Sequence, residues 1–212
     1  LTRSRTVEVG EPFKRIELAE DALDADLIIN LPKLKTHSQM LLTLGIKNLF
    51  GCVIGLRKPE WHLRAGIERA RFALVLVQIH EILRPAITVL DGIVAMEGQG
   101  PGRGGVPRLL GVLMGSNDAL ALDITVCRML GIEPGRVPTN KLAMERGGDD
   151  GPITVVGELP AVRDFRLPEE TSVLFGPPAI HGILRRQFIQ RPVAVGDLCK
   201  RCGECWDYCP VS

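Results

Sequence analysis

The chain has 212 residues, of which 45% are apolar and 24% are charged, and its formal net charge is +1. This composition is ordinary for a globular protein, and the near-neutral charge gives no reason to expect a nucleic-acid partner. The longest apolar run, Phe72–Val77, is too short to span a bilayer, so we also expect no membrane partner.

The first half of the chain predicts one strand followed by two helices. A short apolar run that ends at Pro32 predicts a buried strand over Ala25–Leu31. Apolar residues at helical spacing predict a helix over Gln39–Val53. A longer helix is predicted over His62–Arg84, because Pro85 cannot continue it.

The second half continues the alternation. The β-branched run Ala86–Leu90 predicts a second buried strand. Asn117 or Asp118 suits the N-cap of a helix that runs to about Leu130 and stops at Gly131. The remaining predicted elements are strands over Leu109–Met114 and Ile153–Val156 and a short helix over Lys141–Arg146.

This order of elements predicts an α/β fold. The predicted strands are continuously apolar, which is typical of a largely parallel sheet that is buried on both faces and flanked by helices. We assign residues 1–195 to this domain and residues 196–212 to the start of a small C-terminal ferredoxin-type tail. Residue 1 is Leu1 rather than Met and the chain stops at Ser212, so we expect an N-terminal part to be missing and the tail to be truncated.

Four cysteines near the end of the chain predict a metal centre. Cys199, Cys202, Cys205 and Cys209, followed by Pro210, have the spacing C-x2-C-x2-C-x3-C-P, which is typical of bacterial ferredoxins that bind a 4Fe-4S cluster. Zinc sites more often use two separated cysteine pairs, and disulfides at this spacing would be strained. Whether Cys209 binds the same cluster as the other three, and whether the intact protein has one cluster or two, stays open.

Such a cluster predicts a redox role. It would pass single electrons to or from a donor or acceptor protein, and free thiolates at this spacing favour a reducing compartment, so we expect a cytoplasmic protein. If the chain is an enzyme, this chemistry favours an oxidoreductase. In the alternative hypothesis the cluster is structural or a sensor, and the α/β domain is a non-redox enzyme or a ligand-binding domain.

A second group of residues predicts a site for an anionic small molecule. Lys33, Lys35 and His37 follow the first predicted strand, where open α/β sheets bind ligands, and Lys47 and Asn48 come soon after. Lys47 lies in an apolar segment, where a charged amine needs a partner. The alternative is that Lys33 and Lys35 are solvated and that Lys47 pairs with a carboxylate of another element.

The glycine-rich stretch Asp91–Gly105 offers two carboxylates. Backbone amides of such a stretch after a strand can approach an anion, while Asp91 and Glu97 could act as acid, base or hard-metal ligands. The alternative is a surface loop with two solvated carboxylates. The candidate catalytic residues are therefore His37, Lys47, Asp91 and Glu97.

Several motifs together resemble an uncharacterised family of iron–sulfur-centre proteins, domain of unknown function 362. They are LPKLKTH (Leu31–His37), GIKNLFGCVIG (Gly45–Gly55), DGIVAMEGQGP (Asp91–Pro101) and GSNDALALDITVCRMLGI (Gly115–Ile132), with the cysteine run after them. The resemblance implies an iron–sulfur centre, an additional N-terminal part and a second cluster motif downstream. The pocket residues that it implies are Lys33, Lys35, His37, Lys47, Asn48, Asp91, Glu97 and Asp123.

Overall fold

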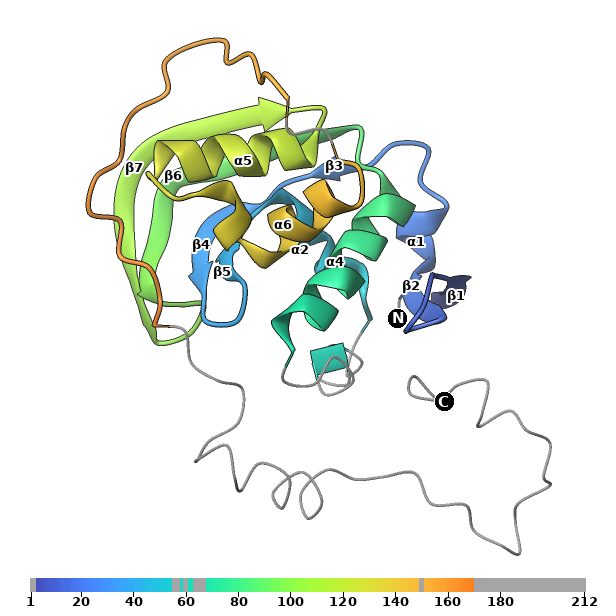
Figure 1. Cartoon of the computed structure of the whole chain (residues 1–212). Helices are drawn as coiled ribbons and strands as arrows, with labels where there is room; N and C mark the ends of the chain where they lie inside the picture. Colours follow the sequence, from blue (N-terminus) through green and yellow to red (C-terminus); the bar gives the residue numbers. More distant parts are fainter. Residues whose placement is uncertain (1–2, 55–57, 59–60, 63–67, 149–150, 170–212) are drawn as a thin grey trace, which may run out of the picture.

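The computed structural model describes residues 3–54, 58, 61–62, 68–148 and 151–169 (Figure 1). The predicted cysteine tail therefore lies outside the described residues. The elements in chain order are β1 (Ser4–Glu8), β2 (Arg15–Ala19), α1 (Glu20–Leu23), β3 (Ile29–Asn30), β4 (Lys33–His37), β5 (Leu41–Thr43), α2 (Gly45–Asn48), the 3-10 turn η1 (Leu49–Cys52), α4 (Arg69–Leu83), β6 (Ile87–Gln99), β7 (Gly104–Ser116), α5 (Ala119–Met129), the 3-10 turn η2 (Pro134–Arg136) and α6 (Pro138–Glu145).

The main sheet is built around the long strand β6. Strands β3 and β4 both run parallel to it, and the same offset in numbering pairs Ile29 with Ile87 and Lys33 with Asp91. Strand β7 pairs with the other edge of β6, so β3 and β4 both pair with the same edge. They therefore follow one another as one strand that is interrupted near Pro32. Strands β5 and β7 join antiparallel to β4 and β6. The predicted α/β fold with parallel strands at its centre is confirmed.

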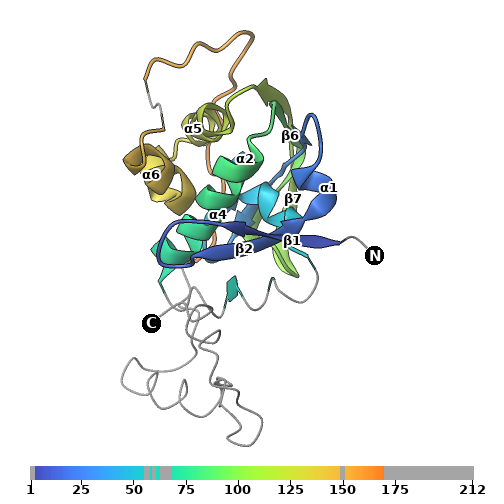
Figure 2. The ribbon, with the colours of Figure 1, turned by 90° about the vertical axis from the view of Figure 1, so that its right-hand side faces the viewer.

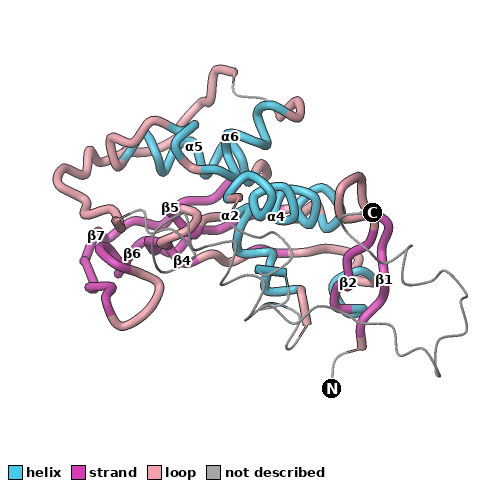
Figure 3. Tube along the Cα trace, turned by 60° about the horizontal axis from the view of Figure 1, so that its bottom comes forward, coloured by secondary structure: helices cyan, strands magenta, loops and turns pink. Residues whose placement is uncertain are grey.

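Helices α2, α4, α5 and α6 gather on one side of this sheet (Figures 2 and 3). Ile46 of α2, Val77 of α4, Ile124 of α5 and Ala143 of α6 meet in one buried cluster. A second cluster joins α5 to the sheet and contains Leu34, among others. Burial of these apolar surfaces supplies the main driving force for this packing.

The opposite face of the sheet differs from the prediction. We expected apolar strands to be buried on both faces, but on this face the described residues leave large side chains exposed, with Leu109 75% and Leu113 64% accessible. The strand register pairs Leu109 with the exposed Val94, and it pairs the exposed side chains of Ile29 and Ile87 with each other. The prediction failed because an apolar strand pattern records the character of both faces but not what covers each of them.

The predicted helix over Gln39–Val53 is wrong. The chain instead forms strand β5, the short helix α2 and the turn η1. Leu41 has a left-handed φ of 62°, and the chain then pairs with β4 before α2 begins. All three residues of β5 are buried, so the segment has no polar–apolar alternation by which a strand could be recognised.

The glycine-rich stretch Asp91–Gly105 is a β-hairpin rather than a loop. Strand β6 continues to Gln99, and β7 begins at Gly104. Gly100 lies so near β4 that an added Cβ would be 2.7 Å from the backbone oxygen of Thr36. The absence of a side chain therefore serves close packing between strands here.

Other predictions differ in extent. The strand predicted over Ile153–Val156 is wrong: this segment forms no strand, and Val156 is 95% exposed. The helix predicted from residue 117 or 118 is confirmed, with the side chain of Asp118 accepting hydrogen bonds from the backbone N–H groups of Leu120 and Ala121. In the part of the chain that the structure describes, no helix has the length and apolar character needed to cross a bilayer.

Helix α2 is fixed to α5 by a buried carboxylate. The backbone N–H of Gly45 donates to Oδ1 of Asp123 at 2.7 Å, and that of Ile46 donates to Oδ2 at 3.2 Å. Asp123 lies on α5, 78 residues along the chain from Gly45, and is fully buried. It satisfies two backbone donors at the start of α2 that have no partner within that helix.

We predict that Gly45→Ala destabilises the fold. The new Cβ would lie 2.9 Å from Oδ1 of Asp123 and 3.1 Å from Cγ2 of Thr88, so α2 would have to move away from α5. Overpacking of this kind costs about 1–3 kcal/mol, measured as a lower free energy of unfolding in urea. Gly51→Ala is the matched control, because no atom lies within 4 Å of its Cβ position. Equal losses in both variants would contradict this account.

Candidate functional site

Five basic side chains come together around the C-terminal part of β4, and we call them the Lys47 cluster. Lys35 and His37 lie on β4, Lys47 lies on α2, and Lys58 and His62 come from the segment that precedes α4. Lys35 and His37 alternate along β4 with fully buried residues of the core. The electrostatic effects of these groups on one another's pKa values show that they are neighbours.

Lys47 is the most enclosed of the three lysines. Its side chain is buried, with 8% of the residue exposed, and Nζ lies 5.8 Å from the ring centroids of both Phe50 and Phe72. Among the described residues no carboxylate forms an ion pair with it. Burial, together with the positive charges of Lys35 and Lys58, lowers the pKa of Lys47 to about 8.

The two histidines of the cluster are held neutral. Burial, followed by the charge of Lys47, lowers the pKa of His37 to about 3, and the same two causes lower the pKa of His62. Nδ1 of His37 accepts hydrogen bonds from the backbone N–H groups of Gln39 and Met40, at 3.2 and 3.3 Å. The proton of the neutral ring must therefore reside on Nε2, which leaves that atom as a donor.

A buried hydroxyl next to the cluster has no partner. Thr43 of β5 lies opposite Lys35 in the antiparallel ladder, and its Oγ1 forms no hydrogen bond among the described residues. Buried hydroxyl groups are nearly always hydrogen-bonded. Thr43 is the last residue of β5, the strand that leads into α2 and Lys47.

Two of the residues predicted to bind a ligand instead hold α2 in place. Nδ2 of Asn48 donates to Oδ1 of Asn30 at 2.9 Å, and Asn30 in turn donates to the backbone oxygen of Gly45. Asp123 accepts the two backbone N–H groups at the start of α2, and burial raises its pKa to about 7. Asn48 and Asp123 thus position Lys47 from outside the cluster.

The predicted residues Lys33 and Asp91 pair with each other. Nζ of Lys33 lies 2.7 Å from Oδ2 of Asp91, and both side chains are about half exposed. The hydrogen bond from Lys33, followed by one from the backbone N–H of Ile93, lowers the pKa of Asp91. This surface pair leaves Asp91 ionised and separate from the Lys47 cluster.

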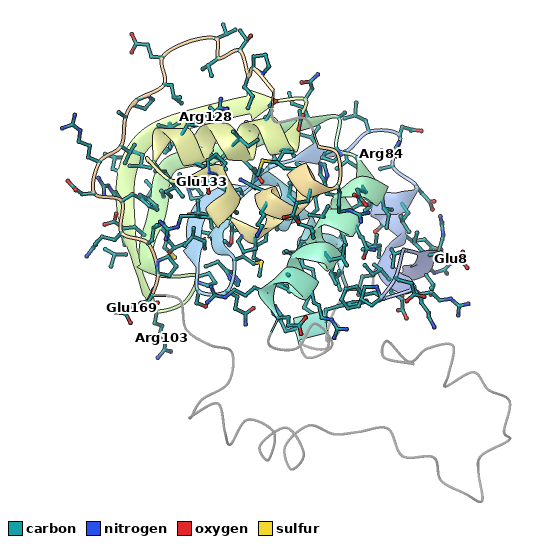
Figure 4. The ribbon with its side chains drawn as sticks, in the orientation of Figure 1. Glu8, Arg84, Arg103, Arg128, Glu133 and Glu169 are labelled. Atoms are coloured by element: carbon teal, nitrogen blue, oxygen red, sulfur yellow. The ribbon has the colours of Figure 1, made fainter. Side chains whose placement is uncertain are left out.

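Glu97 anchors a segment that crosses the sheet and contains residues 163–166. Burial opposes its ionisation, but hydrogen bonds from Arg108 and Arg166, at 2.8 and 2.7 Å, outweigh burial and hold the pKa of Glu97 below its usual range. Arg108 also donates to the backbone oxygens of two residues in that segment. The same segment extends to Glu169, which Figure 4 shows at the same end of the sheet as Arg103 of the β6–β7 turn.

The structure therefore brings together three of the predicted residues and adds others. Lys35, His37 and Lys47 lie in one cluster, as the sequence predicted. His62 and Lys58 had no pattern of their own, because their place in the cluster depends on how α4 and the residues before it pack against α2.

The predicted ligands for iron lie outside the described residues, and nothing in the described part replaces them. Cys199, Cys202, Cys205 and Cys209 belong to the range that the structure does not describe. Within the described ranges, no three His, Cys, Asp or Glu side chains lie together in a way that could hold a metal ion.

Comparison with known proteins gives one family and one relative. Residues 2–128 match the family model described as Domain of unknown function (DUF362). The chain is 40% identical over 179 residues to "Thylakoid-associated protein sll1697" of Synechocystis sp. (strain ATCC 27184 / PCC 6803 / Kazusa), a match that covers 81% of this chain and 55% of the relative. The chain thus spans about half the length of that protein. No solved structure matches the present chain.

We predict that Lys47→Met stabilises the protein at neutral pH. The folded state lowers the pKa of Lys47 from 10.5 to about 8, so the unfolded chain binds the proton more strongly. The contribution of Lys47 therefore lowers the free energy of unfolding of the wild type by its full amount below pH 8. This loss disappears as the pH rises toward 10.5. Met removes this cost, which is on the order of 3 kcal/mol.

The gain should be largest at pH 7 and should shrink by pH 10, as measured by urea unfolding at both values. Lys33→Met is the control, because the exposed ammonium of Lys33 pays no comparable cost of burial. A loss of stability in Lys47→Met at pH 7 would mean that Lys47 has a partner that compensates its charge.

Proposed function

This chain belongs to the family described as Domain of unknown function (DUF362), and we propose that its α/β domain binds an anionic small molecule in the Lys47 cluster. One observation carries the proposal: the charges of Lys35 and Lys58 act on the buried amine of Lys47, and no carboxylate among the described residues compensates Lys47. Buried charges in proteins are paired. An anion would supply the missing pair.

The chemistry of the cluster indicates the kind of anion. Three lysines offer compact positive charges, Nε2 of His37 offers a neutral N–H donor, and Thr43 offers an unsatisfied hydroxyl. These groups suit carboxylate or phosphate oxygens, which accept several hydrogen bonds each. The cluster also includes the C-terminal residues of β4, a strand parallel to β6, and open α/β sheets bind ligands at the carboxyl ends of their strands.

We further propose that the four cysteines of the tail hold a 4Fe-4S cluster, one or two in the intact protein. Thiolates are the donors that iron in such clusters prefers, and Cys199, Cys202, Cys205 and Cys209 have the ferredoxin spacing. When bound, the cluster would supply single-electron transfer. The α/β domain would then hold the anionic molecule, and a donor or acceptor protein would exchange electrons with the tail, as in an oxidoreductase.

A second candidate function is favoured by the site itself. The Lys47 cluster is built from the α/β domain alone, so that domain can bind an anion whether or not electrons pass through the tail. In this candidate the protein is a non-redox enzyme or a binding domain, and its iron–sulfur cluster is structural or a sensor. For both candidates we propose a cytoplasmic, reducing location, because the predicted ligands are free thiolates, and neither a nucleic-acid nor a membrane partner.

We predict that inorganic phosphate or oxalate binds the full chain in isothermal titration calorimetry and that Lys47→Met weakens this binding at least about tenfold, which corresponds to ~1.4 kcal/mol. At pH 8.5 binding should take up protons, since a bound anion raises the pKa of Lys47 again. This uptake appears as a dependence of the measured heat on the ionisation enthalpy of the buffer. Lys33→Met should bind like the wild type, and equal affinity in Lys47→Met would remove Lys47 from the site.

We predict that the protein binds iron and sulfide under anaerobic conditions. Reconstituted protein should absorb visible light through thiolate-to-iron charge transfer, and dithionite should bleach this absorption reversibly if the cluster is a redox centre. Cys202→Ser should lower the iron content, whereas Cys52→Ser should not, because Cys52 is an isolated cysteine of the α/β domain. Colourless, iron-free material would exclude the cluster, and colour that dithionite leaves unchanged would favour the structural candidate.

A further inference from the structure

We propose that Lys47 forms an imine with the carbonyl carbon of a small 2-oxo acid whose carboxylate is held by the other lysines of the cluster. This inference rests on the proposed anion site and names its ligand class. The amine of Lys47 differs from those of the other described lysines in its surroundings. It is enclosed by apolar side chains and other bases, and no carboxylate lies beside it among the described residues.

The surroundings of Lys47 favour the reactive form of an amine. Only the neutral amine has the lone pair that attacks a carbonyl, and desolvation or a neighbouring cation increases its fraction. Both conditions hold here: the rings of Phe50 and Phe72 flank the amine, and the charges of Lys35 and Lys58 act on it. Lys33, by contrast, is about half exposed and pairs with Asp91.

A second group in the cluster suits the carbonyl oxygen. Nδ1 of His37 is occupied by two backbone N–H groups, which leaves Nε2–H as a donor that does not compete with the amine for a proton. Because the ring stays neutral at physiological pH, it can donate a hydrogen bond to the oxygen on which negative charge develops. His37 would therefore polarise the carbonyl rather than protonate the amine.

The step needs no oxidant or reductant. The lone pair of Nζ forms a bond to the carbonyl carbon, the carbonyl electron pair moves to oxygen, and one proton passes from nitrogen to that oxygen to give a neutral carbinolamine. The second N–H proton then passes to the hydroxyl group, which leaves as water while the nitrogen lone pair forms the double bond to carbon. Amine and 2-oxo acid thus yield an imine and one molecule of water, and hydrolysis reverses the step.

Reductive trapping on the full chain tests the proposal. Glyoxylate is the probe, and sodium cyanoborohydride converts any imine to a stable secondary amine that intact-mass measurement and peptide mapping detect. At pH 7 we expect one adduct per chain at Lys47, formed roughly two orders of magnitude faster than at exposed lysines, in line with the larger fraction of neutral amine. Modification spread over surface lysines, without preference for Lys47, would overturn the proposal.

Variants and competition separate this inference from the proposed function. Lys47→Arg has no primary amine, so it should lose the adduct, whereas Lys33→Arg should behave like the wild type in both assays. Phosphate binding without trapping at Lys47 would reject the imine and leave the anion site standing. Failure of both in the wild-type chain would reject the proposed function as well.

Two further measurements keep the test independent of how well Lys47→Arg folds. Phosphate added to the wild-type protein should slow trapping at Lys47 and leave trapping at Lys33 unchanged. Acetaldehyde, which has a carbonyl but no carboxylate, should react with Lys47 at least about tenfold more slowly than glyoxylate if the lysines hold the carboxylate, a difference of ~1.4 kcal/mol. Equal rates, or no protection by phosphate, would contradict the assignment of a 2-oxo acid.

Discussion

The arrangement of this domain depends on the buried carboxylate of Asp123. Its two oxygens accept the first backbone N–H groups of α2, which fixes that four-residue helix against α5. So short a helix has little stability of its own, and packing must supply it. Gly45 allows the two helices to approach, since a Cβ there would collide with Asp123. This connection, together with the hydrogen bonds of Asn30 to Asn48 and Gly45, sets the position of Lys47.

Around Lys47 the fold concentrates charge of one sign where water has little access. Burial and mutual repulsion both disfavour protonation, which is why the pKa values of Lys47, His37 and His62 all fall. An arrangement that costs stability in this way is typical of functional sites, where side chains are held for a ligand rather than for one another. Two carboxylates that the sequence offered as candidates are engaged elsewhere: Glu97 holds a crossing segment, and Asp91 pairs with Lys33.

The local sequence pattern predicted an element correctly wherever the residues of that element alone were enough to identify it. The N-cap at Asp118 and the strand that begins near residue 87 agree with the sequence prediction. It failed over 39–53, where a fully buried strand and a short helix have the same apolar composition. It also failed over 91–105, where glycines that suggested a loop instead allow close pairing of β6 and β7.

The sequence by itself determined the α/β class, the family resemblance and the presence of Lys35, His37 and Lys47 near the end of a strand, because each of these is encoded over a few consecutive residues. Only the tertiary structure decided which charges meet. It paired Lys33 with Asp91, buried Asp123 under α2 and added His62 to the cluster. These contacts join residues far apart in the chain, and their energies depend on burial and distance, which no local pattern records.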